Sequence, residues 1–314
     1  MTNFKNTKNL KPVTIIVSNI LKYSSDELIN CILDLFNVYN TNTNEFINDV
    51  ENLENKELQQ RLKSECLKYI ENIPTNSPII WYTSLESYKE NKFLFNDDNI
   101  IINDLDSISD ITRINFHYLF AEYDWMTKFT RNRTETKKML PVIAKINLGH
   151  SKDIKICNDF NEVINLPIQY EIFEEVLNIE NEFILNVFND KELVLYKKDK
   201  EGNLEAFQYL PVFENEIEDD IVTDKKNNID SNQKFINNIK KINDIIKNVI
   251  TAKSYELNFC VTKDGKFKVI DINLIPSLKI PSVLAMFETI YNQFYNNIPE
   301  EFVNILNKYK KLKR

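Results

Sequence analysis

The chain has 314 residues, of which 43% are hydrophobic and 27% charged, and its formal net charge is −8. This length predicts two or three units that together bury a sizeable core. The acidic balance, without a long basic tract, excludes nucleic acid as the main partner. With only three glycines, Gly149, Gly202 and Gly265, the sequence also excludes a P-loop and a Rossmann fingerprint.

No apolar run approaches the length of a membrane span, and residues 1–12 lack the apolar stretch of a signal peptide. We therefore expect a cytoplasmic protein with no membrane partner. The four cysteines are far apart in apolar surroundings, which favours buried free thiols over zinc ligands or disulfides. Any metal must then be held by oxygen ligands.

Residues 1–105 predict a small α/β unit in which a strand is followed by a helix. Apolar residues at helical spacing indicate helices over residues 24–39 and 55–73. Short apolar runs between polar turns predict strands at 12–20, 77–84 and 98–104.

Residues 106–314 predict a second unit, which opens with a long helix over 107–126. Strands in hairpins follow, at 140–147, 153–157, 168–177, 181–190 and 192–198. The acidic stretch 214–233 is typical of a solvated loop. Three further elements are predicted after it: a helix to residue 252, a hairpin over 255–273 and a closing helix over 281–295.

The end of that last hairpin, "KFKVIDINLIPS", carries a carboxylate and an amide two residues apart. Because strand side chains alternate, Asp271 and Asn273 share one face. Two interpretations stand at this point. The pair can provide oxygen ligands for Mg²⁺, or it can cap a turn before Pro276.

The order of these elements over residues 99–280 resembles the ATP-grasp superfamily, in which two α+β lobes clamp ATP. The resemblance implies an α/β ATP-grasp fold with an N-terminal pre-ATP-grasp domain at 1–105 and an ATP-grasp domain at 106–314. The hinge between the lobes would lie near 173–178. The implied cofactors are ATP and Mg²⁺.

The family has an acidic residue, any residue and then Asn at the end of this hairpin. Asp271 and Asn273 match that pattern, so the resemblance implies that they are Mg²⁺ ligands. Where the family commonly has a metal-binding Asp, this chain has Asn258. An amide brings no charge, so Glu256, two residues earlier on the same face, is the candidate to compensate.

For the nucleotide, the resemblance implies that Lys145 contacts the phosphates; the alternative is a solvent-facing lysine on an edge strand. His150 and Ser151 stand where the family has its phosphate-covering loop. At the hinge, Glu174 and the backbone of Glu175 and Val176 would meet adenine. The resemblance also implies that Glu182 contacts the ribose. It implies catalytic roles for Arg113 and Lys198, and for His150 as well.

The implied activity is ATP-dependent formation of a C–N bond through an acyl phosphate, by positioning and charge neutralisation. The partners would be a small-molecule or peptide carboxylate and an amine. One alternative is an inositol polyphosphate kinase of the same fold, which is disfavoured because Trp81, Tyr82 and Asn186 stand where that branch has lysines. The other is a non-catalytic nucleotide-binding protein. We expect substitutions of Lys145 and Asp271 to leave folding intact.

Overall fold

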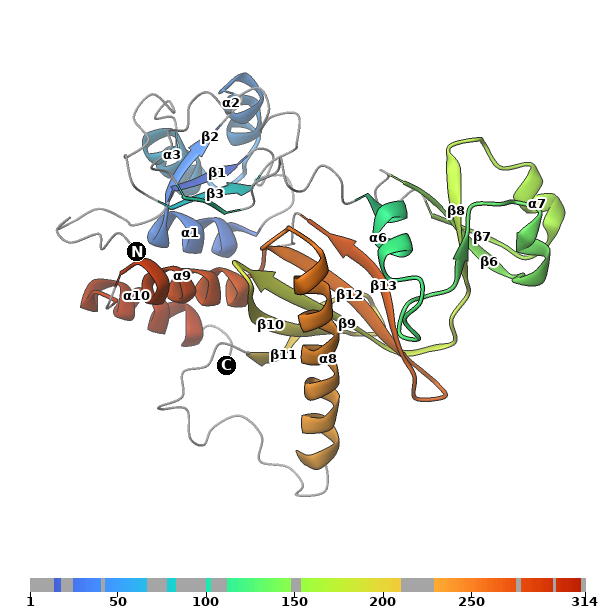
Figure 1. Cartoon of the computed structure of the whole chain (residues 1–314). Coiled ribbons are helices and arrows are strands. Elements are labelled where there is room, and N and C mark those ends of the chain that lie inside the picture. Colours follow the sequence, from blue (N-terminus) through green and yellow to red (C-terminus); the bar gives the residue numbers. More distant parts are fainter. Residues whose placement is uncertain are drawn as a thin grey trace.

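The computed structural model describes residues 14–17, 25–40, 43–66, 78–82, 100–102, 112–147, 154–209, 229–274, 278–295 and 298–311. Within them the chain forms three sheets (Figure 1). We call these the N-terminal sheet, the middle sheet and the C-terminal sheet.

The N-terminal sheet is parallel and has the strand order β2-β1-β3-β4. Its strands are β1 (Thr14–Val17), β2 (Asn37–Asn40), β3 (Pro78–Tyr82) and β4 (Ile100–Ile102). Within the described residues, the helices of this unit are α1 (Asp26–Leu35), α2 (Thr43–Glu51) and α3 (Lys56–Glu65). This confirms a small α/β unit near the start of the chain.

The middle sheet is antiparallel, in the order β5-β8-β6-β7. It consists of β5 (Phe129–Thr130), β6 (Val142–Ile146), β7 (Ile154–Cys157) and β8 (Tyr170–Glu175). Three short helices accompany it, namely α6 (Arg113–Leu119), the 3-10 helix η4 (Glu135–Lys138) and α7 (Phe160–Ile164).

The C-terminal sheet is antiparallel, in the order β11-β10-β9-β12-β13. Its strands are β9 (Ile179–Phe188), β10 (Lys191–Lys198), β11 (Leu204–Tyr209), β12 (Tyr255–Thr262) and β13 (Phe267–Asn273). Helix α8 (Ile229–Val249) packs on one face of this sheet and closes a core with Leu257 and Phe259 (Figure 1).

Two helices end the chain, α9 (Ile280–Phe294) and α10 (Glu300–Lys311). They lie beside α1 in Figure 1, and all three helices contribute to one core, which includes Leu33, Phe287 and Tyr309. This core contains residues of both predicted domains. The division of the chain into domains at 1–105 and 106–314 is therefore still a proposal.

Several predicted helices differ from those observed. The helix predicted over 24–39 ends at Leu35, because residues 37–40 pair in parallel with β1 as strand β2. Of the helix predicted over 107–126, residues 107–111 lie outside the described residues, and α6 ends at Leu119. The chain after Phe120 turns to run along β13, where the Val269 amide donates to the Trp125 carbonyl.

Other predictions need smaller corrections. Helix α8 begins at Ile229, inside the stretch predicted as a loop, and residues 214–228 of that stretch lie outside the described residues. The predicted closing helix is followed by α10. The four cysteines are free and buried, as expected. In the described residues, no helix is both long and apolar enough to cross a bilayer.

Candidate functional site

Helix α6 presents two polar side chains, Arg113 and His117, one turn apart on the same face. The helix begins after Thr112, whose hydroxyl accepts from the Asn115 amide at 3.2 Å. The Ile114 amide donates to the side-chain oxygen of Asn147, just beyond β6, at 3.0 Å. These contacts fix α6 against the middle sheet.

Arg113 joins the middle sheet to the C-terminal sheet. Its Nη1 donates to the Ile146 carbonyl at 2.6 Å, and its Nη2 and Nε donate to the two carboxylate oxygens of Asp271 at 2.8 and 3.2 Å. A two-point pair of this kind fixes the carboxylate in orientation as well as in position. Arg113 therefore holds a predicted metal ligand in place.

Lys145 is buried, which excludes the alternative of a solvent-facing lysine. Its side chain is 3% exposed, and Nζ lies 2.7 Å from Glu174 Oε2. The other Glu174 oxygen lies 2.9 Å from His117 Nε2. Burial by itself raises the pKa of Glu174, but the charge of Lys145 and the contact with His117 outweigh it, and the net pKa is lowered. The Glu174 carboxylate is thus ionised and fully occupied.

The predicted metal ligands lie on one face of the C-terminal sheet. Asn258 on β12 is directly opposite Asp271 on β13, and Glu256 is opposite Asn273. Residues opposite one another share a face, and Asn258 is adjacent to Phe259, which points into the core beneath α8. The four polar side chains therefore lie on the face away from α8.

The oxygens of this cluster suit Mg²⁺, which prefers carboxylate and carbonyl ligands. In the described residues, however, no three His, Cys, Asp or Glu side chains are grouped to hold a metal ion. A magnesium site here would therefore depend on the amides of Asn258 and Asn273. Glu256 is 5% exposed and receives a contact from Asn186 Nδ2 at 3.5 Å.

Glu182 and Lys198 lie on this same face, farther along the sheet. They are opposite one another on β9 and β10, and Glu182 is opposite Cys260 on β12. The Lys198 Nζ lies 2.7 Å from Glu182 Oε2, and both side chains are more than a third exposed. An exposed pair contributes little to stability, so both groups can turn toward a ligand at small cost.

The hinge places Glu175 and Val176 between the middle and C-terminal sheets. The Glu175 amide already donates to the Lys128 carbonyl at 3.0 Å, so it is not available to adenine. In the part of the chain that the structure describes, the amides of Val176 and Leu177 have no such backbone partner. Of the two predicted backbone positions, Val176 is the one with a free donor.

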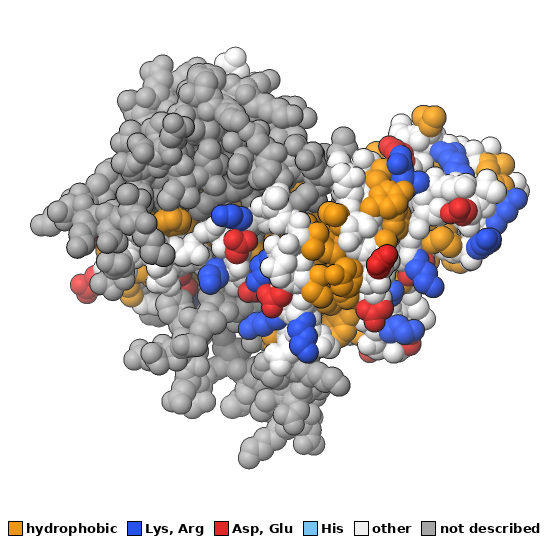
Figure 2. Space-filling view, viewed as in Figure 1, with side chains coloured by type: hydrophobic (Ala, Val, Ile, Leu, Met, Phe, Trp, Pro, Cys, Tyr) orange, Lys and Arg blue, Asp and Glu red, His pale blue; other side chains and the backbone are white. Residues whose placement is uncertain are grey.

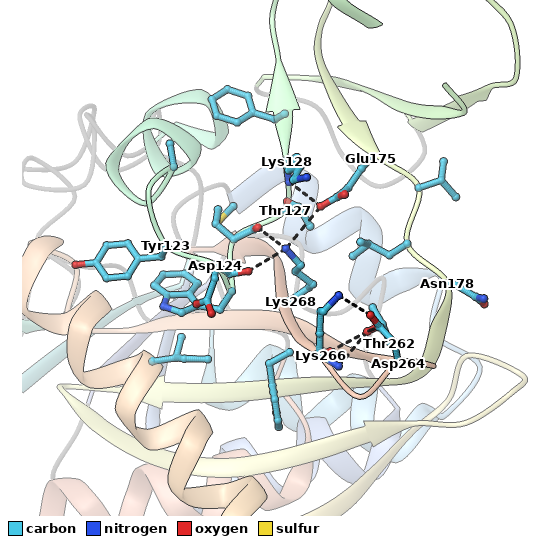
Figure 3. A pocket seen from close by; sticks show the side chains of 18 of the residues that line it. Tyr123, Asp124, Thr127, Lys128, Glu175, Asn178, Thr262, Asp264, Lys266 and Lys268 are labelled. Atoms are coloured by element: carbon cyan, nitrogen blue, oxygen red, sulfur yellow. Dashed lines mark hydrogen bonds and ion pairs between the residues drawn. The ribbon is translucent and has the colours of Figure 1, made fainter. Parts of the chain in front are cut away.

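A cavity of about 1470 Å³ is lined by residues of the hinge from Glu175 to Asn178, by Asn238 and Ile242 of α8, and by Lys268 of β13. Figure 3 shows Lys268 pointing toward Glu175, with Nζ 3.7 Å from the carboxylate. Figure 2 shows apolar side chains gathered on this face of the molecule. Tyr123, which lines the cavity, is 40% exposed. The residues that line this cavity do not include Asp271 or Asn258.

No protein-family model matches the sequence, and no curated protein is similar to it. Several solved structures, in contrast, are similar to this protein. One, the N5-carboxyaminoimidazole synthetase of Staphylococcus aureus, is 15% identical with a TM-score of 0.53; the alignment covers 91% of this chain and 79% of that one. The N5-carboxyaminoimidazole ribonucleotide synthetase of Thermotoga maritima is 12% identical with a TM-score of 0.51, covering 87% and 75%.

The ATP-grasp ligase PsnB, solved with a phosphomimetic variant of a minimal precursor, Mg and ADP, is 12% identical with a TM-score of 0.52. The alignment covers 92% of this chain and 99% of PsnB. The protein has the ATP-grasp fold. At these identities the likeness shows the fold alone, and it confirms the expected α/β lobes.

Within the ATP-grasp fold, the structure brings together most of the predicted site residues. Arg113, Lys145 and Glu174 form contacts beside β13, and Asp271 and Asn273 lie next to Asn258 and Glu256. His150 and Ser151 lie outside the described residues, so their predicted roles stay predictions.

Sequence reasoning missed the part played by His117. The available signal was its spacing from Arg113, because residues i and i+4 share a helix face. It also missed that Arg113 and Asp271, which are 158 positions apart, form an ion pair.

Proposed function

We propose that the protein is an ATP-dependent, ADP-forming ligase that joins a carboxylate to an amine through an acyl phosphate. The observation that carries this proposal is the register of β12 and β13, which places Asp271 and Asn273 beside Asn258 and Glu256 on one sheet face. Arg113 reaches the same carboxylate from α6.

The chemistry assigned to these residues is positioning and charge neutralisation. Asp271, Asn273 and Asn258, with Glu256, would hold Mg²⁺, which when bound neutralises charge on the ATP phosphates. Lys145 and Arg113 supply the fixed cations, and Lys198 is the proposed contact to the transferred phosphoryl group. Glu182 accepts from the ribose hydroxyls, and the Val176 amide pairs with adenine.

For the acceptor we propose a small-molecule or peptide carboxylate. The names of the similar structures support this range. One is an N5-carboxyaminoimidazole synthetase, one is an N5-carboxyaminoimidazole ribonucleotide synthetase, and PsnB was solved with a variant of a minimal precursor. Asn186, where the inositol polyphosphate kinases have a lysine, is buried and accepts from Ser282 Oγ at 2.6 Å. It offers no cation to a polyphosphate.

The test uses ATP labelled at the γ-phosphate, Mg²⁺ and pools of amino acids, peptides and inositol phosphates. A ligase releases free labelled phosphate with ADP, and hydroxylamine intercepts its intermediate as a hydroxamate. Stable transfer of label to an inositol phosphate would establish the kinase instead. If the protein binds nucleotide but releases ADP with none of the pools, it is a non-catalytic nucleotide-binding protein.

Two matched variants of the β12–β13 hairpin test whether Asp271 takes part in the reaction. Asp271→Asn should lower turnover by about a hundredfold or more, because it removes charge from the proposed metal site. Asp264→Asn changes an exposed turn carboxylate and should leave turnover within about twofold of the parent. Equal effects of the two changes would contradict the assignment of Asp271.

A further inference from the structure

Three ionisable side chains form one buried row between α6 and the middle sheet. His117 is 0% exposed, Glu174 1% and Lys145 2%. Burial of so many ionisable groups is costly unless each is paired and hydrogen-bonded. The row lies beside the proposed nucleotide site, because Lys145 Nζ is 3.4 Å from the carbonyl of Ile270, the residue before Asp271.

The protonation of His117 follows from its partner. An ionised carboxylate only accepts hydrogen bonds, so the nitrogen facing Glu174 Oε1, Nε2, must carry the hydrogen. The other ring nitrogen, Nδ1, is buried and has no partner among the described residues. Nε2 is therefore the nitrogen through which His117 acts on Glu174.

The ammonium group of Lys145 has three donors. Glu174 Oε2 accepts one at 2.7 Å and the Ile270 carbonyl accepts a second at 3.4 Å. In the part of the chain described by the structure, the third has no acceptor. A phosphate oxygen can therefore bind without displacing Glu174, provided that the carboxylate keeps the lysine in this orientation.

We propose that His117 is a positioning residue of the nucleotide site, which holds Glu174 by one oxygen so that the other directs Lys145 toward the phosphates. This inference rests on the proposed function, because it assumes that the ligand of Lys145 is a nucleotide. His117 acts through Glu174 and does not itself touch the ligand.

A packing role for His117 is the competing explanation. Its ring stacks on Phe129 with centroids 4.7 Å apart and an interplanar angle of 30°. Two substitutions separate the roles. His117→Phe keeps an aromatic ring for Phe129 and removes the donor, whereas His117→Gln keeps a side-chain N–H near the Nε2 position and removes the ring. Phe129→Leu disturbs the same packing without touching the hydrogen bond.

The experiment measures two properties of each full-length variant: the mobility of the Lys145 ammonium by nitrogen NMR, assigned with Lys145→Arg, and the dissociation constant for Mg-ADP by calorimetry. His117→Phe should make the ammonium mobile and weaken Mg-ADP binding about tenfold, the loss expected for one hydrogen bond to a charged group. His117→Gln and Phe129→Leu should keep both properties within about twofold of the parent.

Parent-like ammonium mobility and Mg-ADP affinity in His117→Phe, or losses matched by Phe129→Leu, would overturn the proposal. Nitrogen NMR of the unsubstituted protein tests it without any variant, because a His117 ring without a hydrogen on Nε2 would also overturn it. If the parent binds no Mg-ADP, the proposed function fails, while ammonium mobility still decides whether His117 holds Lys145.

Discussion

At the scale of single residues, the structure changes what substitution of Lys145 should do. From the sequence, Lys145 is a site residue whose loss leaves folding intact. In the structure it is paired with Glu174 in the interior, 2.7 Å from a carboxylate that is 2% exposed. Removing one partner of a buried pair leaves an uncompensated charge, and that expectation about folding has to be replaced.

We therefore predict that Lys145→Ala lowers the free energy of unfolding by about 3 to 5 kcal/mol. Lys198→Ala is the matched control, since its pair with Glu182 is more than a third exposed and contributes about 1 kcal/mol or less. Urea denaturation of both variants at neutral pH measures the difference. Similar midpoints for the two would contradict a buried charged pair.

The same pair predicts an acid dependence of stability. The folded pKa of Glu174 is lowered from the ordinary value of 4.5, so its stabilisation is complete above that value and is lost as the pH falls through the folded pKa. In Glu174→Gln this part of the dependence disappears. Urea denaturation of both proteins, from neutral pH down to about pH 3, measures how steeply the free energy of unfolding changes with pH.

At the scale of elements, the β9–β10 hairpin shows a turn whose chemistry follows from its sequence. Asn189 and Asp190 both have positive φ, 46° and 64°. Two consecutive residues of this kind make the tight hairpin turn that matches the twist of its strands, and Asn and Asp tolerate it well.

We predict that Asp190→Val destabilises the protein by about 1 to 2 kcal/mol, because a β-branched residue is strained at positive φ. Asp190→Gly relieves the strain and should be neutral or slightly stabilising. Thermal unfolding of the two variants gives the comparison. Equal midpoints would show that the turn adopts another conformation in solution.

The sequence predicted the elements whose signals are local. Turn residues and alternating apolar positions located β8, β9, β10 and the β12–β13 hairpin, and the polar pair at Asp271 and Asn273 marked the candidate site. It missed β2 and the early end of α6, because both depend on partners far along the chain. The contacts of Arg113 with Asp271 and of His117 with Glu174 are equally non-local.

At the scale of the whole molecule, the core that includes Leu33, Phe287 and Tyr309 joins the N-terminal unit to α9 and α10. Tyr309 on α10 is buried against the N-terminal unit, and its hydroxyl donates to Asp34 of α1 at 2.8 Å. Arg61 and Lys308 also pair with this carboxylate, at 2.7 and 3.4 Å. Asp34 therefore ties three helices together.

We predict that Tyr309→Phe lowers the free energy of unfolding by about 1.5 to 3 kcal/mol, because it removes a hydrogen bond to a charged group and keeps the buried ring. Lys308→Ala removes a contact to the same carboxylate from a side chain that is 62% exposed, and should cost about 1 kcal/mol or less. Chemical denaturation of the two variants measures both free energies of unfolding. A larger decrease for Lys308→Ala than for Tyr309→Phe would show that Lys308, and not Tyr309, is the more important partner of Asp34.

The joining of α1 with α9 and α10 in one core has a consequence for how the protein is made. The ribosome delivers α1 well before α10, although their apolar faces cover one another. Domains usually fold in the order of their synthesis, but this N-terminal unit cannot complete its interior until α9 and α10 have emerged. Nascent and prematurely terminated chains therefore expose apolar surface that chaperones and proteases recognise.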